Sequence, residues 1–230
     1  NSELAHYNYS ACATVTATHQ LQSNSNNNND SAEQQQPKKL LSSIAYITVG
    51  TGIGVGLVVN GQTVHGLIHP EGGHLYAPLH QSDMDAGFKG TCLFHGSCIE
   101  GMASAGSIAA RKGFTNNSEL AKLSDDDPVW DTVAHYLAHL CVSICLLTSV
   151  QRIVISGGVL NRLCLYPKIQ AQFKQLLNGY MNHPMLLLTD KDDTKDDGNA
   201  SNGNYITGSE FGDEAGIIGA LCLCLRSPSS

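Results

Sequence analysis

Residues 66–100 place the strongest constraint on the fold, because they hold many glycines, histidines and cysteines and little apolar periodicity. Such a segment buries too little apolar surface to fold unaided. Within it, Cys92, His95 and Cys98 follow C-x2-H-x2-C spacing, and His74 is the best candidate for a fourth ligand. Two thiolates and two imidazoles close a tetrahedral zinc site with no open position, so we predict a structural Zn²⁺. The alternative is a chance cluster around an inert cysteine pair.

Charge and leader signals narrow the class of protein. The 230 residues carry a formal net charge of −7, and the 13 Lys and Arg are scattered, so we expect no nucleic-acid partner. Residues 1–20 lack the basic region and the apolar region of a signal peptide. We therefore expect a cytoplasmic protein whose eight cysteines are reduced. The apolar run 133–150 contains His135 and His139, which favours a buried helix with satisfied histidines over a membrane span or a metal pair.

Ordered structure is expected to begin at Ile44 with an antiparallel meander. The run 44–49 is rich in β-branched residues, and a second run at 56–59 ends in Asn60-Gly61. Asn-Gly between two apolar runs is the strongest short hairpin signal, so the partner strand is expected at 62–64.

The rest of the chain alternates helices and strands. Helices are predicted at 99–112, from the Asp125–Pro128 start signal to about Val150, at 163–177, and after a loop within 212–225. Strands are predicted at 152–156 and 185–188. Helices and strands alternating after a hairpin indicate an α/β fold.

Two glycine-rich loops follow predicted strands. Glycines at 50, 52, 54 and 56 surround Thr51, and their backbone could approach a phosphate closely, although a tight hairpin explains them equally well. Ser156-Gly157-Gly158 follows the strand at 152–156, where an α/β sheet binds ligands or simply turns into a helix.

Together these residues resemble the ROK family of sugar kinases. The family signature fits from Val49 to His74, with its E-x-G-H motif at Glu71–His74. The zinc box fits Cys92–Glu100, and a His at position 95 of that box is similar to the bacterial-type fructokinase branch. The stretches 64–74, 130–147, 156–159 and 212–216 add to the resemblance, which covers about 44–225 apart from the polar insert.

The resemblance implies the actin-like ATPase (ribonuclease H-like) fold, in which two α/β lobes flank the site. It implies an ATP-dependent hexose kinase that transfers the γ-phosphoryl group of ATP, with Mg²⁺, to the 6-hydroxyl of D-fructose. Sugar hydroxyls would be held by Glu71, His74 and Glu100, and His74 would also ligate zinc. The residues implied to face the nucleotide are Gly50, Thr51, Gly52, Gly106, Gly157 and Gly158.

The family's general-base Asp and its N-terminal D-x-G-x-T phosphate hairpin are not found in the chain. We therefore expect the base just before Asn1 and expect this chain alone to be inactive. Residues 1–21 would be a remnant of the N-terminal lobe, 22–43 a disordered Asn/Gln-rich insert, and 44–226 the C-terminal lobe with a polar insert at 190–204.

We expect a homodimer without a membrane partner. The alternatives are another ROK sugar kinase (a mannokinase, glucokinase or N-acetylmannosamine kinase), a sugar-sensing ROK repressor, and a catalytically dead sugar-binding or structural protein.

Overall fold

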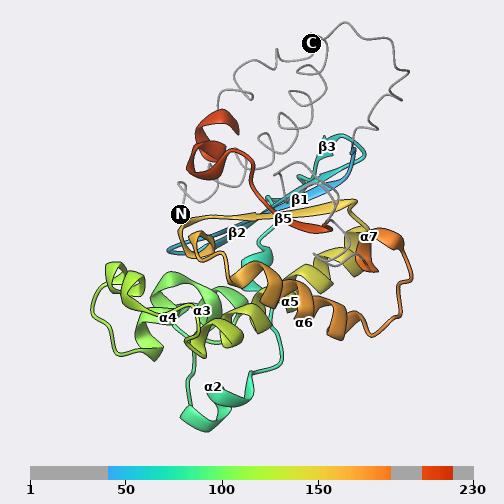
Figure 1. Ribbon diagram of the computed structural model, residues 1–230. Helices are drawn as coiled ribbons and strands as arrows, with labels where there is room; N and C mark the ends of the chain where they lie inside the picture. The colour runs from blue at the N-terminus through green and yellow to red at the C-terminus, as the bar shows by residue number, and fades with distance from the viewer. Residues whose placement is uncertain (1–40, 188–203, 220–230) are drawn as a thin grey trace, which may run out of the picture.

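A five-stranded mixed sheet forms the centre of the computed structural model, which describes residues 41–187 and 204–219 (Figure 1). The strand order is β3-β2-β1-β4-β5. The strands are β1 (Ile44–Val49), β2 (Ile53–Val59), β3 (Gln62–Thr63), β4 (Arg152–Ser156) and β5 (Ile206–Gly208).

The predicted meander is confirmed, because β1, β2 and β3 pair antiparallel in sequence order. Asn60 and Gly61 both have positive φ, 52° and 76°, as a two-residue hairpin turn requires. β4 instead pairs parallel to β1, with Thr48 opposite Ser156. The carboxyl ends of these two strands therefore lie side by side, which places the two glycine loops at the same edge of the sheet.

Helices α3 to α6 lie on one side of the sheet (Figure 1). Ala45, Ile47 and Val49 of β1 point into the main core together with the side chains of α5, whereas Ile44 and Tyr46 point to the opposite face. This alternation follows from the two-residue period of a strand. The helices are α2 (Gln81–Ala86), α3 (Ile99–Ala103), α4 (Ala105–Arg111), α5 (Val129–Thr148), α6 (Leu165–Leu177) and α7 (Pro184–Leu187).

The apolar helix predicted near 133–150 is α5, the central helix of the core. By length and composition it could cross a membrane, but 67% of its most apolar window is buried inside the molecule. Trp130, Tyr136 and Leu140 on this helix are at most 1% exposed. Its apolar character is therefore explained by packing against the sheet and α6.

Two predicted elements are wrong in detail. The helix expected at 99–112 is interrupted at Ser104, whose extended backbone (ψ 164°) ends α3 and whose hydroxyl accepts a hydrogen bond from the Ser107 N–H at the start of α4. The strand expected at 185–188 forms α7 instead: Pro184 occupies its first position, and the Leu186 N–H donates to the His183 carbonyl at 2.9 Å. Short apolar runs fit either state, so periodicity alone could not decide.

The segment 66–100 also contains more regular structure than the loop that was expected. It includes a 3-10 turn at Gly72–His74 and the short helix α2. The predicted remnant 1–21 and the inserts 22–43 and 190–204 lie outside the described residues, apart from 41–43 and 204.

Candidate functional site

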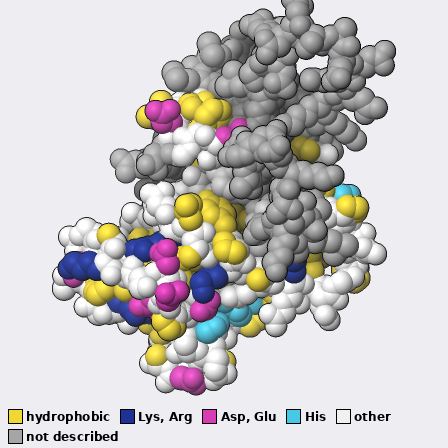
Figure 2. All heavy atoms as spheres, viewed as in Figure 1, with side chains coloured by type: hydrophobic (Ala, Val, Ile, Leu, Met, Phe, Trp, Pro, Cys, Tyr) yellow, Lys and Arg dark blue, Asp and Glu magenta, His cyan; other side chains and the backbone are white. Residues whose placement is uncertain are grey.

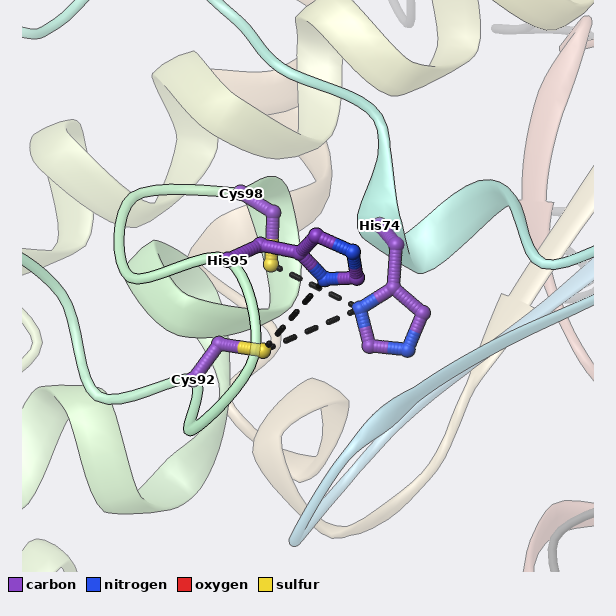
Figure 3. Close-up of side chains that lie close together, drawn as sticks. All are labelled: His74, Cys92, His95 and Cys98. Carbon is purple, nitrogen blue, oxygen red and sulfur yellow. Dashed lines mark hydrogen bonds between the residues drawn. The ribbon is translucent and has the colours of Figure 1, made fainter.

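Four side chains of the segment 66–100 converge on one point (Figure 3). His74 comes from the 3-10 turn, and Cys92, His95 and Cys98 come from one tight loop before α3. Nδ1 of His74 lies 3.9 Å from Sγ of Cys92 and 3.6 Å from Sγ of Cys98, and Nδ1 of His95 lies 3.8 Å from Sγ of Cys92. All four ligand atoms lie within 4.8 Å of one another. Among the described residues, this is the group that could hold a metal ion.

These separations suit tetrahedral coordination. Metal–ligand bonds of 2.0–2.3 Å imply ligand–ligand edges of about 3.3–3.8 Å. Burial raises the pKa of the Cys98 thiol to about 11, so this thiol is protonated at neutral pH unless a cation is bound beside it. A divalent cation favours the thiolate and releases its proton on binding. The donor set and its spacing therefore fit a metal ion.

Two predicted sugar-binding carboxylates flank this cluster. Oε2 of Glu71 is 4.0 Å from Nε2 of His74, and Oε1 of Glu100 is 4.0 Å from Nδ1 of the same ring. His74 thus turns one nitrogen toward the thiols and the other toward Glu71. The structure brings the three predicted sugar residues together within one small region.

The start of β2 ties this region to the first glycine loop. Oε2 of Glu100 accepts a hydrogen bond of 2.9 Å from the backbone N–H of Ile53. Gly73 packs so closely on Ile53 that a Cβ added to Gly73 would collide with the Ile53 carbonyl oxygen. The N-cap of α3 is Cys98, whose sulfur accepts a hydrogen bond from the Gly101 N–H. The Glu100 carboxylate therefore binds the backbone of β2 instead of capping its own helix.

The predicted nucleotide residues also meet at this edge of the sheet. The backbone carbonyl of Gly50 accepts from the Ala105 N–H at 2.8 Å, which places Gly106 beside the first loop. Gly157 has φ 105°, and a Cβ there would lie 2.5 Å from the carbonyl oxygen of Val49. Open space faces Gly50, Gly106 and Gly158, since a Cβ at any of them would meet nothing within 4 Å.

A cavity of about 620 Å³ opens beside the second glycine loop. The sequence analysis had singled out Gly157 and the stretch 212–216, whose Gly212 also lines the cavity, but it missed the lining residues from α6 and from β5 and its flanks. They share no local motif: β4 and β5 pair in parallel, and the side chains of Tyr166 and Gln170 on α6 donate hydrogen bonds to the backbone carbonyls of Ile155 and Ile206 on these strands. The lining includes Ser156, Gly157, Tyr166, Gln170, Asn204 and Thr207.

A buried ion pair fixes α2 to the helical layer. Asp83 is 2% exposed and accepts two hydrogen bonds from Arg111, at 2.7 and 3.0 Å, and one from the Tyr136 hydroxyl at 2.6 Å. The guanidinium also lies over the Phe88 ring, 4.3 Å from its centroid. This network attaches the middle of the segment 66–100 to α4 and α5.

The histidine pair on α5 belongs to a different cluster. The rings of His135 and His139 are 4.6 Å apart, His80 lies 5.2 Å from His135, and Nε2 of His135 contacts the Pro78 carbonyl at 2.8 Å. Burial lowers the pKa of His80 and of His139, with the neighbouring His135 adding to both shifts. These three rings pack α2 against α5, as predicted for helical histidines with a structural role.

The sequence of the chain is similar to sequences of known proteins. A family model described as "ROK family" matches residues 14–227. The fructokinase of Streptococcus mutans is 38% identical over 144 residues, covering 63% of this chain and 48% of its own. The fructokinase of Zymomonas mobilis is 33% identical over 182 residues, covering 79% and 54%. The chain spans about half the length of the curated relatives it matches.

Solved structures show the fold. A ROK hexokinase from Thermus thermophilus matches with a TM-score of 0.62 at 21% identity, over 94% of this chain and 66% of that one. A ROK family glucokinase from Streptomyces griseus, solved with glucose and AMPPNP, matches with a TM-score of 0.57 at 17% identity, over 93% and 66%. The predicted α/β, actin-like ATPase fold is confirmed. By its sequence match and its fold, the chain belongs to the ROK family.

Proposed function

We propose that the protein carrying this chain is a fructokinase, which transfers the γ-phosphoryl group of Mg-ATP to the 6-hydroxyl of D-fructose. Relatives named fructokinase at 32–38% identity support this proposal. The residues implied to bind sugar and those implied to bind phosphate both adjoin the short stretch Gly50–Ile53. That junction is the observation that carries the proposal, because phosphoryl transfer requires donor and acceptor to be held next to each other.

The sugar would be bound by Glu71, His74 and Glu100. Carboxylates accept hydrogen bonds from several hydroxyls, and a rigid set of them rejects sugars that lack a matching hydroxyl. Glu100 suits this role because one of its oxygens is fixed on the Ile53 backbone while the other faces His74. We further propose that an aspartate outside residues 1–230 accepts the proton of the attacking hydroxyl.

The nucleotide would lie along the carboxyl ends of β1 and β4. Thr51 is exposed at the first loop, and open space faces Gly50, Gly106 and Gly158. Backbone N–H groups in such loops bind phosphate oxygens. The cavity bounded by Gly157, Tyr166 and Thr207 would receive the nucleoside part, since it opens directly beside the second loop.

The His74–Cys92–His95–Cys98 cluster would hold a structural Zn²⁺. Two histidines and two cysteines are a typical closed zinc site, and the distances between the four donors fit it. A bound Zn²⁺ would fix the ring of His74 without contacting the reacting phosphate. The ion would thereby orient the sugar side of the site.

We also propose a cytoplasmic homodimer. The described cysteines are all free thiols, which suits a reducing compartment. Several large apolar side chains of the segment 66–100 are exposed, including Leu67 at 100% and Leu93 at 96%, and they offer a surface for a second copy. Acidic and basic side chains are interspersed on the face seen in Figure 2, unlike a nucleic-acid-binding surface. Light scattering on the purified protein measures the number of copies.

The first test uses the complete gene product that carries this chain. We expect phosphorylation of D-fructose with Mg-ATP, measured by a coupled assay, and weaker activity on mannose and glucose. Equal or greater activity on glucose or mannose would replace the proposed substrate with another hexose. No transfer to any hexose would refute the proposed function.

Two substitutions then separate the sugar side from the nucleotide side. Glu100→Gln removes a carboxylate acceptor and should raise the KM for fructose about tenfold while the KM for ATP changes little. Thr51→Val removes a hydroxyl at the phosphate loop and should do the reverse. If Glu100→Gln lowers only the melting temperature and leaves the fructose dependence unchanged, Glu100 merely ties α3 to β2.

A further inference from the structure

His69 lies behind one of the proposed sugar-binding carboxylates and has no role in the site described so far. Its Nε2 is 2.7 Å from Oε1 of Glu71. The His69 side chain is 18% exposed, and the Glu71 side chain is 42% exposed. The histidine is therefore the buried partner of the pair, and the carboxylate is the partner that solvent and ligands can reach.

The buried nitrogen of His69 depends on this carboxylate. Nε2 is shielded from solvent and has no hydrogen bond of good geometry within the described residues. Its one close anionic neighbour is Oε1 of Glu71. An unpaired buried donor is costly, so a small rotation of the carboxylate that aligns the two groups is favourable. The contact thus restricts the rotamers that Glu71 can adopt.

The backbone around Glu71 leaves its carboxylate free for such a contact. Glu71 precedes the 3-10 turn Gly72–His74, but its side chain makes no capping hydrogen bond there. Pro70 stands between His69 and Glu71 and fixes its own φ, which limits how far the two side chains can move apart. With Oε1 on His69, Oε2 faces Nε2 of His74 at 4.0 Å.

We propose that His69 is a positioning residue of the sugar site: it holds Glu71 so that Oε2 and the outward nitrogen of His74 present one acceptor and one donor to the same sugar hydroxyl. This inference rests on the proposed function, because it assigns a task to the sugar side of that site. His69 itself need not touch the sugar. It restricts the rotamers of Glu71 before the sugar binds, so less conformational entropy is lost on binding.

The test compares two substitutions in the complete gene product. His69→Leu removes the donor and should raise the KM for fructose roughly tenfold, with the KM for ATP within about twofold of the wild type. His69→Gln keeps an amide N–H that can reach Oε1 and should stay within about threefold of the wild-type KM for fructose. His65→Leu, four residues upstream and exposed, is the matched control and should leave both KM values unchanged.

Metal content and melting temperature distinguish positioning from folding. Both should remain at wild-type values in His69→Leu, because His69 is not among the four clustered ligands. An unchanged fructose KM in His69→Leu overturns the inference. The inference is also overturned if His69→Leu and His69→Gln raise the KM for fructose equally and also lose the metal or melt at a lower temperature. If the wild type transfers phosphate to no hexose, the proposed function fails and this inference fails with it.

Discussion

The central sheet and the segment 66–100 are held together by different forces. In β1, Ala45, Ile47 and Val49 are completely buried, and α5 covers them with a continuous apolar surface. In the segment 66–100, Leu67 and Leu93 are almost fully exposed, while the buried positions include Asp83 and Cys98. The sheet is stabilised by many weak apolar contacts, and the segment is stabilised by a few specific polar ones.

This difference explains why the candidate sugar residues lie where they do. A polar site cannot be lined by the apolar side chains that stabilise a core, so a loop carrying Glu71 and His74 needs another source of order. We propose that a metal ion bound by His74, Cys92, His95 and Cys98 supplies it at one end, and the Asp83–Arg111 pair supplies it in the middle. Stability concentrated in a few contacts can also be removed by a single substitution, which the following experiments use.

Loss of the metal cluster should produce the largest effect, and it should be confined to one region. Cys98→Ser removes a fully buried ligand and should abolish the one equivalent of zinc that we expect per chain, measured by elemental analysis. Metal binding in small structural zinc sites contributes on the order of 10 kcal/mol, so the segment 66–100 should lose amide protection in hydrogen exchange. Strands β1 and β4 should keep theirs.

Two control variants sharpen this comparison. Cys164→Ala alters a free cysteine outside the cluster and should leave zinc content unchanged. Leu140→Ala should lower the free energy of unfolding of the core by about 2–5 kcal/mol with zinc retained. Wild-type amide protection across 66–100 in metal-free Cys98→Ser would show that the segment does not depend on the ion.

The buried ion pair should rank second. Asp83→Asn leaves the Arg111 guanidinium, whose side chain is 10% exposed, without its counter-charge. Removing one partner of a buried pair typically costs about 3–5 kcal/mol of unfolding free energy, measured here by urea denaturation. Glu119→Gln, in the exposed pair with Lys122, is the control and should cost under about 1 kcal/mol. Equal costs for the two substitutions would contradict the buried-pair assignment.

Acidification should have the smallest effect, acting where α2 meets α5. Burial lowers the folded-state pKa of His80 and His139, so the unfolded chain takes up protons more readily below the ordinary histidine pKa of about 6.5. Their contribution to stability is therefore present above that pH and declines as pH falls toward the folded-state values. His139→Gln should reduce the change in urea midpoint between pH 7.5 and 5.5 with zinc held saturating. An undiminished change would exclude His139 as a contributor.

Local sequence signals predicted the parts of the fold that depend on local physics. The Asn60-Gly61 turn, the apolar period of α5 and the spacing of Cys92, His95 and Cys98 each carry their own signal. The break at Ser104 escaped prediction because a serine that caps a helix also fits inside one. The Asp83–Arg111 pair and the cavity around Tyr166 depend on tertiary contacts between distant segments, and no local pattern reveals them.

The parallel pairing of β1 with β4 has a consequence for synthesis on the ribosome. Ile44 pairs with Arg152, so one edge of β1 has no partner until about 100 further residues have emerged. At roughly 5–20 residues per second, that interval lasts about 5–20 s. An unpaired apolar edge can add strands from other chains during this time. We expect the nascent chain to need chaperone protection between the completion of the meander and the emergence of β4.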